Sequence, residues 1–249
     1  MLAKMLENYK NEQQLAGNRF RHEMKYVCTN SQKVLIESHI KGIVQLDSNA
    51  KKSQEYNGYY NIRSLYFDDI YNSCYYENEN GTDMREKFRI RIYNNCKDRI
   101  LLENKKKIRG KTQKLSCELT EEQCNRLIEG KEIPFDNKTP DLLRKLLLQR
   151  KTKLLKPVVI VDYDRIPYVN PNGNVRITFD LNISSSQRLE NFLGGDIGKR
   201  PIMPANEHIL EVKWDNYIPD YIHHSLQIGE LRQTAFSKYY LCRRFSMHK

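Results

Sequence analysis

Polar and apolar residues alternate along much of this chain, which is the pattern of a β-strand with one polar and one apolar face. The first such run begins at Arg19, where Phe20, His22, Met24 and Tyr26 alternate with charged residues. Similar strand-like runs follow at residues 59–68, 87–93, 99–107, 112–119, 157–168, 174–183 and 208–214. We expect each run to form a strand and the strands to pair mostly antiparallel.

Stretches with the apolar spacing or the capping residues of helices lie between and beside these runs. They cover residues 1–16, 31–43, 71–76, 120–130, 139–152 and 219–227. A polar loop is predicted over residues 49–57. The segment GGDIGKR (residues 194–200) is predicted to be a turn, because it lacks the spacing of a phosphate-binding P-loop. We find no repeat and no clear linker. The chain is therefore expected to form one α+β domain over residues 19–249, after an N-terminal helical extension over residues 1–18.

Charged residues gather on one face of each predicted strand, because side chains at i and i+2 point to the same side. Arg89 and Arg91 share a face, with Ile90 and Ile92 opposite. Comparable faces hold Arg21, Glu23 and Lys25; Glu103, Lys105 and Lys107; Arg176, Thr178 and Asp180; Glu211 and Lys213; and Arg165 in phase with Tyr163.

Two interpretations of these faces are open. The sheet could be half-solvated, with an ordinary wet face. Alternatively, it could close into a barrel with the charged faces inward, which would make a basic tunnel containing a few carboxylates. The amphipathic helices need apolar surface to cover, and the repeated mixture of Arg or Lys with a single Glu is unusual for a solvated face. Both observations favour the tunnel.

Composition indicates the kind of partner and argues against a membrane span, a signal peptide and a zinc site. The 249 residues contain 42 Lys and Arg against 31 Asp and Glu, a net charge of +11 that favours polyanions. The sequence contains no run of 18 apolar residues, so no membrane span is predicted. The first residues lack the apolar core of a signal peptide. Six cysteines without CxxC spacing argue against zinc and for a reduced, cytoplasmic protein. The six histidines show no ligand spacing.

A basic tunnel with carboxylates has a definite chemical use. Arginine offers phosphate oxygens a planar, bidentate fork. Glutamate in the same cavity would repel phosphate unless a divalent cation bridged them, and Mg²⁺ or Mn²⁺ prefers such oxygen ligands. These are the parts that phosphoryl transfer needs, since that reaction depends on positioning and charge stabilisation more than on a side-chain nucleophile.

The sequence resembles the catalytic domain of the vacuolar transporter chaperone (VTC) polyphosphate polymerases, a branch of the triphosphate tunnel metalloenzymes. The resemblance spans about residues 20–240 and depends on motifs in the family's order. They are RFRHEMKY (19–26), SLYFDD (64–69), KFRIRIYN (87–94), LLENKKK (101–107), YDRIPY (163–168), VRITFD (175–180), ILEVKW (209–214) and FSKYY (236–240). It implies an eight-stranded antiparallel β-tunnel with helices packed outside. The implied reaction transfers the γ-phosphate of ATP to a growing polyphosphate chain and releases ADP.

The resemblance also implies roles for individual residues. The implied catalytic phosphate ligands are Arg89, Arg91, Lys105, Arg165, Arg176 and Lys238. Implied substrate contacts are Lys25, Lys114, Lys213 and Ser237. Glu211 is the implied ligand of Mn²⁺ or Mg²⁺, with Glu23 and Glu103 as additional carboxylates.

Alternatives remain open at this point. Glu211 could simply pair with Lys213 or an arginine. The same fold could carry a tripolyphosphate or nucleoside triphosphate hydrolase, or a non-catalytic module that binds polyphosphate or another polyanion. The expected ligands are ATP and polyphosphate, with no specific nucleic acid. Eukaryotic members of the family join this domain to a phosphate-sensing domain and membrane helices. A membrane-protein partner, with peripheral attachment through it, is therefore a further alternative.

Overall fold

The computed structural model describes residues 21–48, 50, 58–227 and 231–247. The helix predicted over residues 1–16, the extension over residues 1–18 and most of the loop over residues 49–57 lie outside the described residues. None of the helices in the described part has both the length and the apolar character that a membrane crossing needs.

Eight strands form one antiparallel sheet in the order β1-β10-β8-β7-β3-β4-β5-β6. All eight strand-like runs of the sequence are confirmed, with ends that differ by a few residues. The strands are β1 (His22–Thr29), β3 (Tyr60–Asp68), β4 (Arg85–Tyr93), β5 (Cys96–Ile108), β6 (Lys111–Leu119), β7 (Lys156–Asn170), β8 (Val175–Ser186) and β10 (Glu207–Trp214). Two short strands extend the sheet: β2 (Gln45–Leu46) pairs with β7, and β9 (Arg200–Pro201) pairs with β8.

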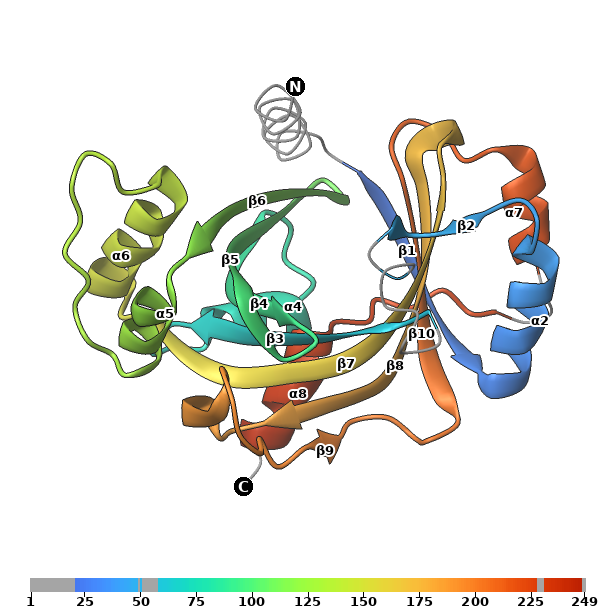
Figure 1. Ribbon diagram of the computed structural model, residues 1–249. Coiled ribbons are helices and arrows are strands. Elements are labelled where there is room, and N and C mark those ends of the chain that lie inside the picture. Colours follow the sequence, from blue (N-terminus) through green and yellow to red (C-terminus); the bar gives the residue numbers. More distant parts are fainter. Residues whose placement is uncertain (1–20, 49, 51–57, 228–230, 248–249) are drawn as a thin grey trace.

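The sheet curls into a half-barrel (Figure 1). Its edge strands, β1 and β6, meet at one bridge, where Arg21 and Thr112 exchange backbone hydrogen bonds of 3.0 and 3.1 Å. Over the rest of their described length the two strands do not pair. The predicted α+β class and antiparallel tunnel architecture are confirmed, but the barrel stays open along this seam.

Strand register places the predicted charged faces on one side of the sheet. Residues directly opposite each other on paired strands point to the same face. Opposed pairs of charged residues lie on both sides of β3: Glu23 and Lys213, Lys25 and Glu211, Lys213 and Arg176, Arg165 and Asp180, Arg89 and Glu103, and Lys105 and Lys114. We call the side of the sheet that carries them the concave face.

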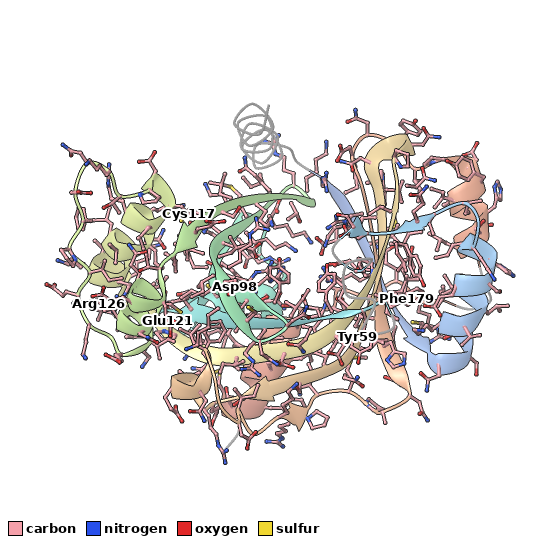
Figure 2. All side chains as sticks on the ribbon, viewed as in Figure 1. Tyr59, Asp98, Cys117, Glu121, Arg126 and Phe179 are labelled. Carbon is pink, nitrogen blue, oxygen red and sulfur yellow. The ribbon has the colours of Figure 1, made fainter. Side chains whose placement is uncertain are left out.

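Apolar residues alternate onto the opposite face, and four helices cover it in two pairs. α2 (Asn30–Ile40) and α7 (Asp220–Leu226) pack over β1, β8 and β10, where Phe179 and Leu210 are fully buried. α5 (Glu121–Ile128) and α6 (Asp141–Lys153) pack over β3, β4 and β5. Figure 2 shows Phe179 on the side of α2 and α7, and Glu121 and Arg126 on the side of α5 and α6.

The C-terminal helix, α8 (Lys238–Met247), packs differently and was not predicted. The Tyr239 ring lies 5.2 Å from the Tyr66 ring, and the Lys87 ammonium lies 4.6 Å above the Tyr239 ring. Tyr66 and Lys87 share the concave face with Arg89, because Tyr66 opposes Arg89 and Lys87 lies two residues before it. α8 therefore covers one end of that face.

Asp68 ties α8 to the sheet and to α4 (Ser73–Glu79). This buried carboxylate accepts a hydrogen bond from the Tyr239 hydroxyl and further ones from the backbone N–H groups of Cys74 (2.9 Å) and Tyr75 (3.2 Å). The motif SLYFDD thus serves to join three elements. Two 3₁₀ turns, η2 (Asn172–Asn174) and η3 (Leu189–Asn191), complete the described elements. The segment predicted as a turn, residues 194–200, has bends at residues 194 and 195 and no regular structure up to residue 199, and its last residue begins β9.

Leu143 of α6 offers a test of the outer core, because it is fully buried whereas Leu148 of the same helix is 62% exposed. Leu143→Ala should lower the free energy of unfolding by about 2–5 kcal/mol, through lost burial and a residual cavity. Leu148→Ala should change it by less than about 0.5 kcal/mol. Urea denaturation followed by circular dichroism measures both values. Equal effects would contradict the described packing of α6.

Candidate phosphate-binding site on the concave face

A fully buried carboxylate, Glu103, forms the centre of a first network of charges. Its Oε2 accepts from the Arg89 Nε at 2.7 Å and lies 3.7 Å from the Arg91 Nη1, and its Oε1 accepts from the Lys114 Nζ at 2.7 Å. Burial disfavours the charged form, but Arg89, Arg91 and Lys114 outweigh it and hold the pKa of Glu103 well below its usual range. Glu103 is therefore a fixed anion that three cations share.

Hydroxyl groups of two tyrosines and a serine also hold the two arginines in position. The Arg89 Nη1 donates to the Tyr66 hydroxyl at 2.8 Å, and the Arg91 Nε donates to the Ser64 hydroxyl at 3.2 Å. Arg91 also reaches the Tyr163 hydroxyl at 3.4 Å. Both guanidinium groups are thus held by side chains of β3 and β7 as well as by Glu103. Such support fixes their planes in the absence of a ligand.

Glu23, Lys25 and Glu211 begin a second network on β1 and β10. The Lys25 ammonium lies 2.9 Å from a Glu23 oxygen and 3.6 Å from a Glu211 oxygen, and it donates to the Phe236 carbonyl at 2.9 Å. Lys105 of β5 reaches across to Glu23 at 3.0 Å. β5 is paired with β6, which faces β1 across the open seam, so this contact crosses the seam.

Asp180 continues the second network toward α8. Arg165 grips Asp180 with two hydrogen bonds of 2.6 and 2.8 Å and donates to Glu211 at 3.2 Å. The Lys238 ammonium lies 2.5 Å from the Asp180 Oδ2, which also accepts from the Arg165 Nη2, and Lys213 donates to Glu211 at 2.7 Å. A residue of the C-terminal helix therefore joins the charges of β7, β8 and β10.

Tyr163 links the two networks. Its hydroxyl contacts Arg91, while its ring lies 4.9 Å from the Lys238 ammonium and 5.4 Å from the Arg165 guanidinium carbon. The linked networks bring together eleven of the thirteen residues that the sequence predicted. They hold eight cationic side chains and four carboxylates, namely Lys25, Arg89, Arg91, Lys105, Lys114, Arg165, Lys213 and Lys238 with Glu23, Glu103, Asp180 and Glu211.

The other two predicted residues lie at the margin. Arg176 is on the same face, but its guanidinium pairs with Asp47 at 2.7 Å, beyond β2, and its side chain is 39% exposed. The Ser237 hydroxyl accepts from the backbone N–H of Tyr240 at 3.3 Å, so it caps the first turn of α8. Neither touches a carboxylate of the networks.

Sequence reasoning omitted Lys87 and Asp180 from the candidate site. Lys87 lies two residues before Arg89 on the same strand, so alternation alone could have found it. Asp180 was placed on a charged face, but its pairing with Arg165 and Lys238 depends on the β7–β8 register and on α8. No local pattern in the sequence encodes those two contacts.

The donor set can be tested for the divalent ion that the resemblance implies. Among the described residues, no group of three or more His, Cys, Asp or Glu is arranged to hold a metal. Glu23 and Glu211 lie on either side of the same ammonium. Burial opposes their ionisation, but lysines outweigh it, so the pKa of Glu23 falls to about 2 and that of Glu211 lies well below its usual range. Mg²⁺ is usually bound by one or two carboxylates together with substrate phosphates. Glu23 and Glu211 could act together in that mode, with an ion displacing the lysine and arginine contacts that they now make, as it would also have to do at Glu103.

The excess of four positive charges in the linked networks suits a triphosphate, which carries about four negative charges. In the absence of a ligand, the carboxylates stabilise cations that would otherwise repel each other. A phosphate chain entering the face can take over donors from these carboxylates without moving the strands. The arrangement can therefore bind and orient a chain of phosphates.

Lys87 and Lys213 should make this binding sensitive to pH. Burial lowers the pKa of each lysine to about 8, so both are charged at pH 7 and lose their protons as the pH rises through 8. ATP is the suitable ligand for this test, because its terminal phosphate loses its last proton at about pH 6, below this range. The affinity for ATP should therefore fall several-fold between pH 7 and pH 9. Isothermal titration at fixed ionic strength measures it.

Variants separate Lys87 from other groups. Lys87→Arg keeps the charge at both pH values and should show a smaller fall in affinity, whereas Lys87→Met should bind more weakly at pH 7. Lys87→Met should also raise the melting temperature at pH 7. The unfolded state holds that proton more tightly than the folded state, so the buried charge destabilises the fold. An unchanged pH profile in both variants would rule out this role.

The family model described as the VTC domain matches residues 20–246. A search of curated proteins found no relative of this chain. Solved structures that resemble it include a protein from Bacillus halodurans described as an adenylate cyclase, at 13% identity and a TM-score of 0.47, covering 85% of this chain and 88% of that one.

Two further structures have names that mention triphosphatase activity. A Hippeastrum protein first assigned as an adenylyl cyclase, and described as having a dominant triphosphatase activity, is 12% identical with a TM-score of 0.48; the match covers 91% of this chain and 95% of that one. The capping enzyme triphosphatase of Mimivirus is 12% identical with a TM-score of 0.38, covering 90% and 91%. The family model, which matches most of the sequence, decides the relationship: this chain belongs to the VTC domain family.

Proposed function

We propose that this protein is a polyphosphate polymerase that transfers the γ-phosphate of ATP to the end of an inorganic polyphosphate chain. The observation that carries the proposal is the set of ionised carboxylates interleaved with twice as many cations on the concave face. Membership of the VTC domain family supports the same substrate class. The functional unit is residues 19–249.

Arg89 and Arg91 are the residues best placed to grip the phosphoryl group in transfer. Their guanidinium groups are adjacent on β4, and both are held by Glu103 and by hydroxyls behind them. Fixed donors of this kind stabilise the charge of a phosphoryl transition state without reorganisation. Lys25, Lys105, Lys114, Lys213, Arg165 and Lys238 would bind the remaining phosphates of the nucleotide and of the polymer.

The low pKa values of the carboxylates favour transfer over hydrolysis. A general base works best with a pKa near the working pH. Glu23, with a pKa of about 2, and Glu103, with a pKa far below its usual range, are therefore poor bases for activating water. The terminal oxygen of polyphosphate is already anionic and needs no base. It forms the new P–O bond while the bond from the γ-phosphorus to the bridging oxygen breaks, and ADP leaves.

Glu211 and Glu23 are the residues that would hold Mn²⁺ or Mg²⁺. When bound, such an ion would neutralise phosphate charge and help to orient the nucleotide. Burial opposes their ionisation, but Lys105 beside Glu23, Lys213 beside Glu211, and Lys25 between the two carboxylates keep both ionised at neutral pH. We further propose that the protein acts in the cytoplasm, with ATP and polyphosphate as its ligands. Peripheral attachment through a membrane-protein partner is part of the same proposal.

The proposal is tested by incubating the purified protein with ATP and Mn²⁺. Products are separated on a gel stained for polyphosphate, and ADP and orthophosphate are assayed in parallel. A ladder of polymer with matching ADP is the expected result. Orthophosphate without polymer would instead establish a hydrolase, and binding without turnover would establish a polyanion-binding module.

Single substitutions connect the activity with the concave face. Arg91→Gln should reduce the rate of polymer formation by about 10²–10³-fold, because it removes a positioned donor. Glu211→Gln should cause a comparable loss and raise the Mn²⁺ concentration required. The matched control is Arg126→Gln on α5, outside the concave face, and it should keep full activity. Melting curves must show that each variant is folded; full activity in a folded Arg91→Gln protein would exclude this face as the active site.

A further inference from the structure

A second hollow lies along the later turns of α8, away from the charge networks. Lys238 and Tyr239, in the first turn, contact Asp180 and Tyr66 of the concave face. The later residues of the helix instead line a cavity of about 300 Å³ that also faces the end of β8 and the turn before β9. The residues that decide its chemistry are Ser185, Arg188, Gly198, Arg200, Phe245 and Ser246.

Arg200 presents free donors to this cavity. Its guanidinium carbon lies 5.0 Å from the centre of the Phe245 ring. No side chain or carbonyl in the described part of the chain accepts a hydrogen bond from that guanidinium. Stacking uses the flat face of the group and leaves the N–H donors along its edge available for an anion.

Arg188 forms a second cationic wall, and Gly198 makes room for it. The Arg188 Nη1 donates to the exposed Asp196 carboxylate at 3.2 Å. A Cβ atom added at Gly198 would lie only 3.1 Å from the Arg188 guanidinium carbon, and Gly198 has a φ of +60°. Within the segment of residues 194–200, which was predicted as a turn, glycine at position 198 therefore leaves space for the Arg188 guanidinium.

Hydroxyl groups complete the lining. The Ser185 hydroxyl has only a long contact of 3.5 Å, to the Arg200 carbonyl, so it can donate to a better acceptor. The Ser246 hydroxyl already donates to the Arg243 carbonyl at 2.6 Å and accepts from Arg243, so it supports the wall. Two guanidinium groups and a serine hydroxyl suit a tetrahedral oxyanion. The nearby carboxylate, Asp196, already accepts a hydrogen bond from Arg188.

We propose that this cavity binds a phosphate group at a site separate from the active site. The group could belong to free orthophosphate or to the end of a polyphosphate chain, because both present the same oxygens. The site does not depend on the proposed polymerase activity. Its test therefore uses binding rather than turnover.

The position of the site can be tested by diffraction. Crystals of the full chain are soaked in tungstate, a heavy analogue of phosphate. An anomalous peak between Arg188 and Arg200 is expected, and it should disappear in the double variant Arg188→Gln/Arg200→Gln. The proposal fails if this cavity stays empty at a tungstate concentration that fills the concave face.

Titration in solution distinguishes the two sources of phosphate. Orthophosphate and tripolyphosphate are each titrated into the wild type, the double variant and the Arg126→Gln control. The double variant should lose one binding site, or bind there at least tenfold more weakly, while the control is unchanged. Loss with orthophosphate assigns the site to free phosphate, and loss with tripolyphosphate alone assigns it to a polymer end. Equal stoichiometry and affinity in all three proteins, with both probes, would overturn the proposal.

Discussion

The structure depends on placing carboxylates among cations that would otherwise repel one another. Glu103 shows the constraint in its strongest form, since it is fully buried and bonded to Arg89 and Lys114, with Arg91 nearby. Burying an unpaired charge costs several kcal/mol, so neither the acid nor the arginines could occupy this position alone. The site is therefore built as a set of mutually dependent charges. Removing one member changes the environment of several others.

The strands and helices make this set possible by dividing the sheet into two faces. Alternation sends Arg89 and Arg91 to the concave face and Ile90 and Ile92 to the opposite one, where α5 and α6 bury them. Burial of the apolar face favours folding, whereas burial of charges on the concave face opposes it. Lys87, whose pKa is lowered by burial, illustrates a charge that the fold maintains at a cost.

Much of this could be predicted from local patterns in the sequence. Period-two alternation was sufficient for all eight long strands and for the shared face of Arg89 and Arg91. Strand order, and the seam that only Arg21 and Thr112 bridge in the described part of the chain, depend on pairing between distant segments, which no local pattern encodes. The same is true of α8, whose contacts with Asp68 and Asp180 come from residues far away in the chain. Sequence therefore indicated which residues carry charge, whereas the fold decides which of them meet.

The pairing of β1 with β10 has a consequence for how the protein is made. β1 is the first described strand and β10 the last, so β1 must wait for its neighbour until the chain has been synthesised as far as Trp214. At about 5–20 residues per second, that delay is on the order of ten seconds or more. During this time both edges of β1 expose unpaired backbone groups, as aggregation-prone edge strands do. The alternating charges of Arg21, Glu23 and Lys25 then have an earlier use, because they discourage other chains from pairing with the waiting strand.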